Sequence, residues 1–78
     1  MTDYERALYY VLWGKWDDLF TLMLRSEDDL LKKKIEQFLN AYYYALSQEE
    51  VVRKHDQLIA YLDFATGEQT IYTFTIED

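Results

Sequence analysis

The stretch that most constrains the fold of this chain is residues 26–46, which carry a long helical pattern. Its apolar side chains recur at steps of four, three, four and three residues, which places them on one side of an α-helix. They are Leu31, Ile35, Phe38, Tyr42 and Ala45. Ser26 is predicted to cap this helix, and three acidic residues follow it where the helix dipole favours negative charge. At 1.5 Å per residue the helix spans about 30 Å, so the remaining segments must pack against it.

Two shorter helical patterns precede this central helix. Thr2 and Glu5 have the spacing of a capping box, and apolar residues at helical intervals predict a helix over residues 3–12. Gly14 then interrupts the pattern, because glycine readily adopts the left-handed conformation that ends a helix. A second pattern begins at Trp16, which favours a helical hairpin. The alternative is one continuous helix that tolerates the glycine at a cost of about 1 kcal/mol.

The C-terminal part of the sequence favours a β-hairpin. Ser47 repeats the serine-to-acid spacing of a helix start, which predicts a short helix over residues 48–54. Apolar residues then alternate with a period of two, and a loop ending in Gly67 precedes a segment rich in Thr, Ile, Tyr and Phe. These features predict a hairpin over about residues 57–76. The competing interpretation extends the preceding helix through Leu62, because His55 and its apolar neighbours also fit a helical spacing.

The predicted fold class is therefore α+β, in a single small domain spanning residues 1–78. Three to four helices surround the long central helix at about residues 26–46, and a C-terminal β-hairpin follows at about residues 57–76. A domain of this size buries only about 60–65% of the surface of its unfolded chain, so its margin of stability is narrow. The sequence has no cysteine, so neither a disulfide framework nor a thiolate metal site strengthens it.

Negative charge is concentrated toward the C-terminal end of the sequence. The net charge is −7, and residues 55–78 contain no Lys or Arg. We predict an acidic surface made by Asp56, Asp63, Glu68, Glu77 and Asp78. Direct binding to nucleic acid or to an anionic membrane normally requires basic patches, so neither is expected. A protein partner with a basic surface fits this charge, although solubility alone also accounts for it.

Residue types that support catalysis or metal binding are scarce. His55 is the only histidine, and neighbouring Asp56 could orient it, but cysteine is absent and both serines, Ser26 and Ser47, are better explained as helix caps. The acidic clusters lie at predicted helix starts without the spacing of a calcium loop. Two glycines cannot build a phosphate-binding loop or a dinucleotide motif. We therefore expect no catalytic residue, no metal, no cofactor and no enzymatic activity.

Tyrosine is unusually dense in this sequence, which contains eight. Consecutive tyrosines cannot all be buried on one side of a helix, so some rings must lie at the surface. Tyrosine and tryptophan are enriched where proteins bind one another. We predict a partner-binding surface formed by Tyr9, Tyr10, Trp13, Tyr43 and Tyr44. The function expected from the sequence is a non-enzymatic protein-binding module, a small acidic intracellular inhibitor or regulator of another protein.

Two other functions remain open at this stage. The chain could mimic nucleic acid and inhibit a DNA- or RNA-binding protein, which requires the predicted acidic residues to share one surface. It could also be a self-associating structural protein that forms a homodimer. A cytoplasmic location is expected, because the N-terminus is acidic where a secretory signal is basic, and the longest apolar run, residues 7–13, is too short to span a bilayer.

Overall fold

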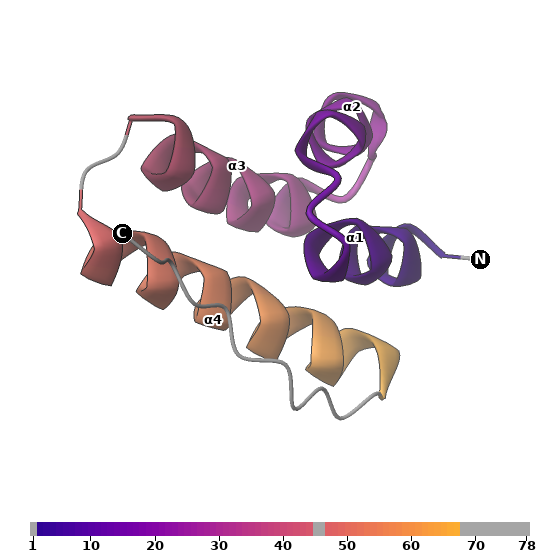
Figure 1. Ribbon diagram of the computed structural model, residues 1–78. Coiled ribbons are helices and arrows are strands. Elements are labelled where there is room, and N and C mark those ends of the chain that lie inside the picture. Colours follow the sequence, from indigo (N-terminus) through magenta and orange to yellow (C-terminus); the bar gives the residue numbers. More distant parts are fainter. Residues whose placement is uncertain (1, 45–46, 68–78) are drawn as a thin grey trace.

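The computed structural model describes residues 2–44 and 47–67, and every regular element within these ranges is helical. Helix α1 spans Asp3–Leu12, α2 spans Trp16–Arg25, α3 spans Asp29–Tyr44 and α4 spans Gln48–Thr66 (Figure 1). The protein is therefore a small all-α domain in its described part. The prediction of an α+β fold is wrong.

The first strand of the predicted β-hairpin is the final part of α4. The buried side chains of this helix follow helical spacing, and they are Val51, His55, Leu58, Ile59 and Leu62. Two residues of the alternating pattern, Ala60 and Phe64, are exposed instead, the latter at 89%. The buried side chains of this segment thus follow the helical spacing and not the alternation of a strand. The second predicted strand, residues 69–76, lies outside the described residues.

Gly67 ends α4 rather than forming a bulge in a hairpin. Its φ of 77° is left-handed, and its N–H donates to the carbonyl oxygen of Asp63 at 2.9 Å. A glycine in this conformation suits a helix C-cap as well as a hairpin turn, which is why the sequence alone misassigned it.

Side-chain caps fix where the helices begin. The predicted capping box of α1 is confirmed, because the Thr2 Oγ1 accepts from the Glu5 N–H while the Glu5 carboxylate accepts from the Thr2 N–H. The Ser47 side chain caps α4, accepting from the N–H of Glu50 at 3.1 Å. The role predicted for Ser26 is wrong: it lies at the C-terminal end of α2.

The side chain that caps α3 belongs to Asp28. Its Oδ1 accepts from the N–H of Leu31 at 3.0 Å, one of the helix-start donors that lack a partner within the helix. The central helix consequently begins three residues later than Ser26, at Asp29. Its last described residue is Tyr44, and residues 45–46 lie outside the described ranges.

The first two helices form a hairpin, as the preferred sequence interpretation predicts. Gly14 has a φ of 65°, and the N–H of Lys15 donates to the carbonyl oxygen of Tyr10 at 2.8 Å. This reversal excludes a continuous helix through the glycine. An added Cβ at Gly14 would be strained by the left-handed backbone, so glycine is required there by conformation.

The four helices pack in a closed ring of neighbours. Helix α1 packs on α2, α2 on α3, α3 on α4, and α4 returns to α1, as the ribbon in Figure 1 shows. Three predicted core residues of the central helix, Leu31, Ile35 and Phe38, are fully buried. Tyr42 lies at the edge of the core and is 36% exposed. The α2 and α4 helices thus each pack against both α1 and α3.

Candidate functional site

Exposed aromatic side chains line the junction between α2 and α3. Two hollows open to solvent there, with volumes of about 470 and 420 Å³. The first is lined partly by Trp16 and Tyr42, the second by Phe20 and Tyr44, and Tyr43 lines both. The shared ring makes the two hollows adjacent. We call these five residues, Trp16, Phe20, Tyr42, Tyr43 and Tyr44, the aromatic surface.

The geometry of α3 forces its last tyrosines outward. Successive residues of an α-helix are rotated by about 100°, so three consecutive side chains cannot share the buried side. Tyr42 leans on the core, with its ring centroid 5.2 Å from that of Trp16. Tyr43 and Tyr44 are 54% and 75% exposed. On α2, Leu19 occupies the buried position and leaves Phe20 44% exposed.

The aromatic surface rests on a buried ring. Phe38 is fully buried, and its centroid lies 5.2 Å from Trp16 and 6.0 Å from Tyr42. Interlocked aromatic rings at these distances favour fixed side-chain positions. The part of the surface formed by Trp16 and Tyr42 is therefore held in place by the core beneath it.

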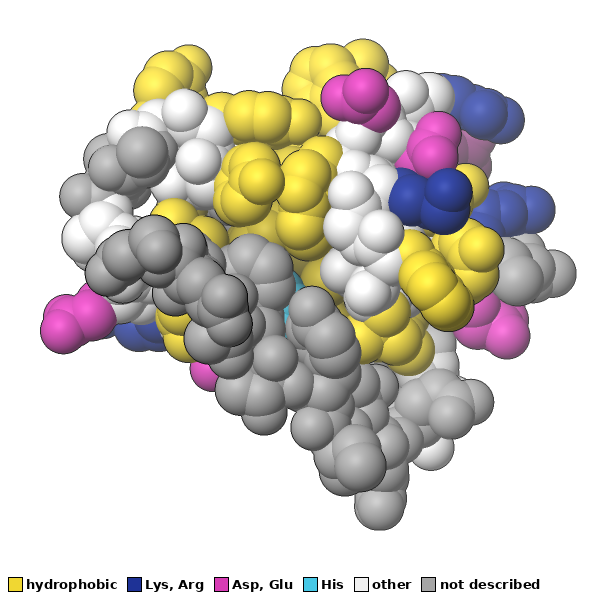
Figure 2. All heavy atoms as spheres, viewed as in Figure 1, with side chains coloured by type: hydrophobic (Ala, Val, Ile, Leu, Met, Phe, Trp, Pro, Cys, Tyr) yellow, Lys and Arg dark blue, Asp and Glu magenta, His cyan; other side chains and the backbone are white. Residues whose placement is uncertain are grey.

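Charged side chains are unevenly distributed around these apolar groups. Lys15, Asp17 and Asp18 border the first hollow, whereas the polar residue beside the second is Asn40. On the face shown in Figure 2, hydrophobic side chains gather over α3, and a group of charged side chains lies beside them over α1 and α2. The border of the first hollow thus carries more negative than positive charge.

The predicted partner-binding residues form two separate groups. Tyr43 and Tyr44 belong to the aromatic surface. Tyr9, Tyr10 and Trp13 are together on α1, where the Tyr9 ring lies 6.0 Å from Tyr10 and 6.1 Å from Trp13. No ring contact described for these residues joins one group to the other. We call the second set, Tyr9, Tyr10 and Trp13, the α1 aromatic group.

Sequence reasoning missed Trp16 and Phe20 as members of the site. The apolar pattern that begins at Trp16 also contains Leu19 and Phe20, which are adjacent and cannot both point inward. The signal that could have identified them is their spacing. Residues four apart lie on one side of a helix, so Trp16, Phe20 and the 62%-exposed Leu24 form a second apolar stripe.

Only part of the predicted acidic surface lies in the described residues. Asp56 is exposed and Asp63 is half-buried, and seven residues, or about two helical turns, separate them along α4. They therefore lie on the same side of that helix, together with the exposed Glu49. Glu68, Glu77 and Asp78 lie outside the described residues.

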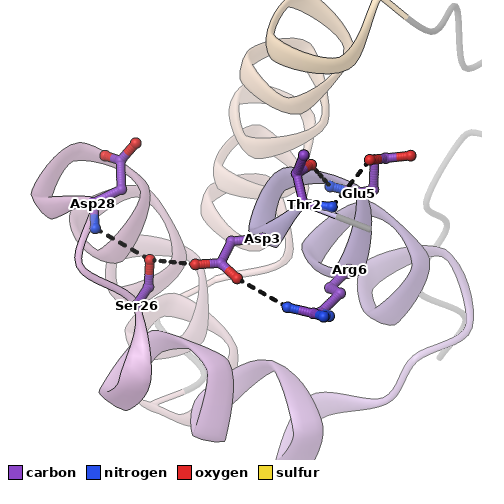
Figure 3. Close-up of polar contacts among 6 residues, drawn as sticks. All are labelled: Thr2, Asp3, Glu5, Arg6, Ser26 and Asp28. Atoms are coloured by element: carbon purple, nitrogen blue, oxygen red, sulfur yellow. Dashed lines mark hydrogen bonds and ion pairs between the residues drawn. The ribbon is translucent and has the colours of Figure 1, made fainter.

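A network of hydrogen bonds joins the start of α1 to the start of α3 (Figure 3). Ser26, only 5% exposed, donates to the Asp3 carboxylate at 3.1 Å and accepts from the Asp28 N–H at 3.2 Å. The Tyr4 hydroxyl donates to the Asp28 carboxylate. We call these four residues, Asp3, Tyr4, Ser26 and Asp28, the polar junction. Its polar groups partner one another, so its role is structural.

A polar hollow of about 370 Å³ lies between α1 and α2, beside the polar junction. Its lining includes two acidic residues, Asp3 and Asp18, and two basic ones, Arg6 and Arg25. Arg6 already pairs with Asp3 at 3.3 Å (Figure 3). Because the opposing charges balance, this hollow shows no net preference for an anion or a cation.

His55 lies in the core rather than in a cleft. Its ring is fully buried, 5.7 Å from the Phe38 ring, and its Nδ1 lies 3.3 Å from the Asp56 carboxylate. Burial lowers the pKa of His55 because it disfavours the charged imidazolium, and Asp56 partly opposes that effect. A substrate would have to displace packed helices to reach this ring.

Two features are absent from the part of the chain that the structure describes. No group of three or more His, Cys, Asp or Glu side chains is arranged there to hold a metal ion. None of the helices α1–α4 combines the length and apolar character that a membrane span requires.

Comparison with known proteins yields a family and one similar relative. The sequence model of a family described as YhdB-like protein matches residues 1–69, a range that includes all four helices. A protein of Bacillus subtilis (strain 168) titled "Uncharacterized protein YhdB" is 45% identical over 64 residues, covering 82% of this chain and 80% of that protein. No solved structure matches the chain.

Proposed function

The chain belongs to the YhdB-like protein family, and we propose that it is a non-enzymatic protein-binding module, a small acidic inhibitor or regulator of another protein. One observation carries this proposal: Phe20, Tyr43 and Tyr44 are about half or more exposed around two adjoining hollows. Large exposed aromatic side chains that converge on hollows are typical of protein-binding sites.

The rigidity of the surface supports the same proposal. Phe38 and Trp16 hold Tyr42 from below, so part of the surface is ordered before a partner arrives. A preorganised surface loses less conformational entropy on binding, which leaves more of the contact energy as affinity. Tyrosine adds a hydroxyl that can donate or accept a hydrogen bond at the rim of an interface.

We propose the cytoplasm as the place where this binding occurs. The cysteine-free sequence fits a reducing compartment, where disulfides do not form. The partner is another protein, and the negative net charge of −7 favours one with a basic surface.

Site-specific photo-cross-linking tests the proposal. A photoreactive amino acid replaces Tyr44 in the full chain, and a control chain carries it at the exposed Gln57 on α4. We expect a discrete cross-linked partner in cells with the Tyr44 position and none with the control position. Equal cross-linking at both positions, or none at position 44, would remove the aromatic surface as the binding site.

A nucleic-acid mimic is the second candidate, and the alignment of Glu49, Asp56 and Asp63 on one side of α4 favours it. Salt distinguishes the two candidates, because screening shortens the reach of charge. A partner captured at about 0.1 M salt and lost at about 0.5 M indicates recognition through carboxylates. Retention at the higher salt indicates docking through aromatic rings. A homodimer, the remaining alternative, is detected by light scattering.

A further inference from the structure

We propose that the partner presents a basic amphipathic α-helix, which lies along the α2–α3 junction and places two apolar side chains in the two hollows. This inference rests on the proposed function and specifies the form of the partner. The aromatic surface would still be a protein-binding site if the partner bound it in another conformation.

The two hollows are lined by residues that lie about one turn apart on α2. Trp16 lines the first hollow and Phe20 the second, and they lie four residues apart on α2. Four residues correspond to a rise of about 6 Å. Side chains at positions i and i+4 of a partner helix are separated by the same rise, so one apolar anchor can enter each hollow.

Tyr43 sets the boundary between the anchors. It lines both hollows, whereas Tyr42 lines only the first and Tyr44 only the second. A ring between two depressions separates the side chains that enter them and favours a partner with discrete anchors. Both hollows are open to solvent along the surface, which suits an elongated partner better than an enclosed small molecule.

The charge around the first hollow indicates which residues the partner helix carries beside its first anchor. Asp17 and Asp18 border the first hollow, and Lys15 also lines it. Lys or Arg beside the first anchor would therefore meet net negative charge. A second copy of this chain is disfavoured as the occupant, because two copies with a net charge of −7 each repel one another.

A peptide titration of the full chain, labelled with ¹⁵N, tests this inference. The probe is a synthetic helical peptide with leucines at positions i and i+4 and lysines on its remaining surface. One control peptide replaces lysine by glutamate, and a second scrambles the sequence so that the leucines lie on opposite sides. We expect saturable amide shifts at residues 16–20 and 40–44 with the probe, and at least tenfold weaker binding of both controls.

Matched variants of the chain locate the contact. Phe20→Ala and Tyr44→Ala should each weaken binding of the probe about tenfold. Tyr9→Ala, which removes an exposed tyrosine from the α1 aromatic group, should leave it unchanged. Replacing both acids, Asp17→Asn with Asp18→Asn, should reduce the preference for the lysine peptide over the glutamate peptide. The amide spectrum of each variant reports whether its fold is intact.

Several outcomes would overturn the inference. Shifts centred on Asp56 and Asp63 would mean that a basic peptide simply binds the acidic side of α4. Equal affinity for the scrambled peptide would exclude the i and i+4 anchors. If photo-cross-linking at position 44 captures a partner while the probe does not bind, the helical partner is wrong and the proposed function stands. If both fail, the proposed function fails as well.

Discussion

The two ends of α3 differ in what they bury and what they expose. At its N-terminal end the polar junction pairs its hydrogen-bonding groups around Ser26, whose side chain is buried. At its C-terminal end the aromatic surface places apolar rings in solvent, with Tyr44 the most exposed of them. Each end departs from the usual distribution of polar and apolar groups. The difference teaches that one helix joins a structural end to the end at which we propose that a partner binds.

The energetic consequences of the two ends should be opposite. A buried polar group that loses its partner is costly, so changes in the polar junction should lower stability. An exposed side chain contributes little to folding, and its replacement usually changes the free energy of unfolding by no more than about 0.5 kcal/mol. Changes in the aromatic surface should therefore appear in binding.

Phe38→Ala should have the largest effect, because this buried ring supports the aromatic surface from within the core. Removing a buried phenylalanine costs about 3–5 kcal/mol, through lost burial and the cavity that remains. Urea unfolding measures the loss. A cost below about 1 kcal/mol would show that the core collapses around the gap, and that the aromatic surface lacks a rigid floor.

Replacing Tyr43 and Tyr44 together by alanine should separate binding from stability most clearly. Loss of central aromatic anchors typically costs about 2 kcal/mol or more of binding free energy, which is about thirtyfold in affinity. Affinity is measured with the partner identified by photo-cross-linking. The unfolding midpoint should stay close to that of the unmodified chain, since both rings are more than half exposed. Unchanged affinity would show that these tyrosines are only an edge of the core.

Asp28→Ala should show the reverse behaviour. The substitution removes the cap of α3 and the acceptor of the Tyr4 hydroxyl, and should lower the free energy of unfolding by about 1–2 kcal/mol. Asp29→Ala is the matched control, because its side chain is exposed in the next position. Partner affinity should be retained in both variants. Equal stability of the two would mean that the polar junction contributes little.

The smallest effect concerns pH and the buried His55, which lies behind the aromatic surface against Phe38. Its pKa is lowered from 6.5 chiefly by burial, so the folded state binds the proton less well than the unfolded state. The stability that neutral His55 contributes is complete above pH 6.5, the ordinary pKa of histidine, and is lost as pH falls through the lowered pKa of the folded state. Unfolding at about pH 7.5 and 5.5 should show this loss, and His55→Leu should reduce its size. The same pH dependence in both proteins would assign the loss to other groups.

Local signals made the first half of the fold predictable. The capping box at Thr2 and Glu5 and the glycine at position 14 each specify a backbone conformation within a few residues. Ser26 shows the limit of such reasoning. Ser26 and Asp28 are both good capping residues, and the choice between them depends on Asp3 and Tyr4, which come from another helix. The sequence spacing contains no information about that contact.

The C-terminal half was mispredicted because two periods fit the same residues. Leu58 and Leu62 belong both to the alternating pattern and to the helical stripe. Packing on α1 and α3 selects the helix, because it buries His55 and Ile59 as well, while Phe64 remains in solvent. Tertiary contacts of this kind override local propensity.

The candidate site was predictable only in part. The run of consecutive tyrosines correctly predicted exposed side chains at positions 43 and 44, because neighbouring residues of a helix are rotated by about 100°. The same run could not predict that Phe20 lies beside them, because the position of Phe20 depends on how α2 packs against α3. Whether these residues bind a partner stays a prediction.

The return of α4 to α1 has a consequence for synthesis on the ribosome. Helix α1 packs on α4, which is translated only after α2 and α3, whereas its contact with α2 is local in sequence. At about 5–20 residues per second, the nascent chain needs several seconds to reach the end of α4 after α1 is complete. Helix formation takes microseconds, so translation sets the delay, and the helices made before α4 remain an incomplete assembly until it is finished. During that interval the side of α1 that will meet α4 is open to chaperones.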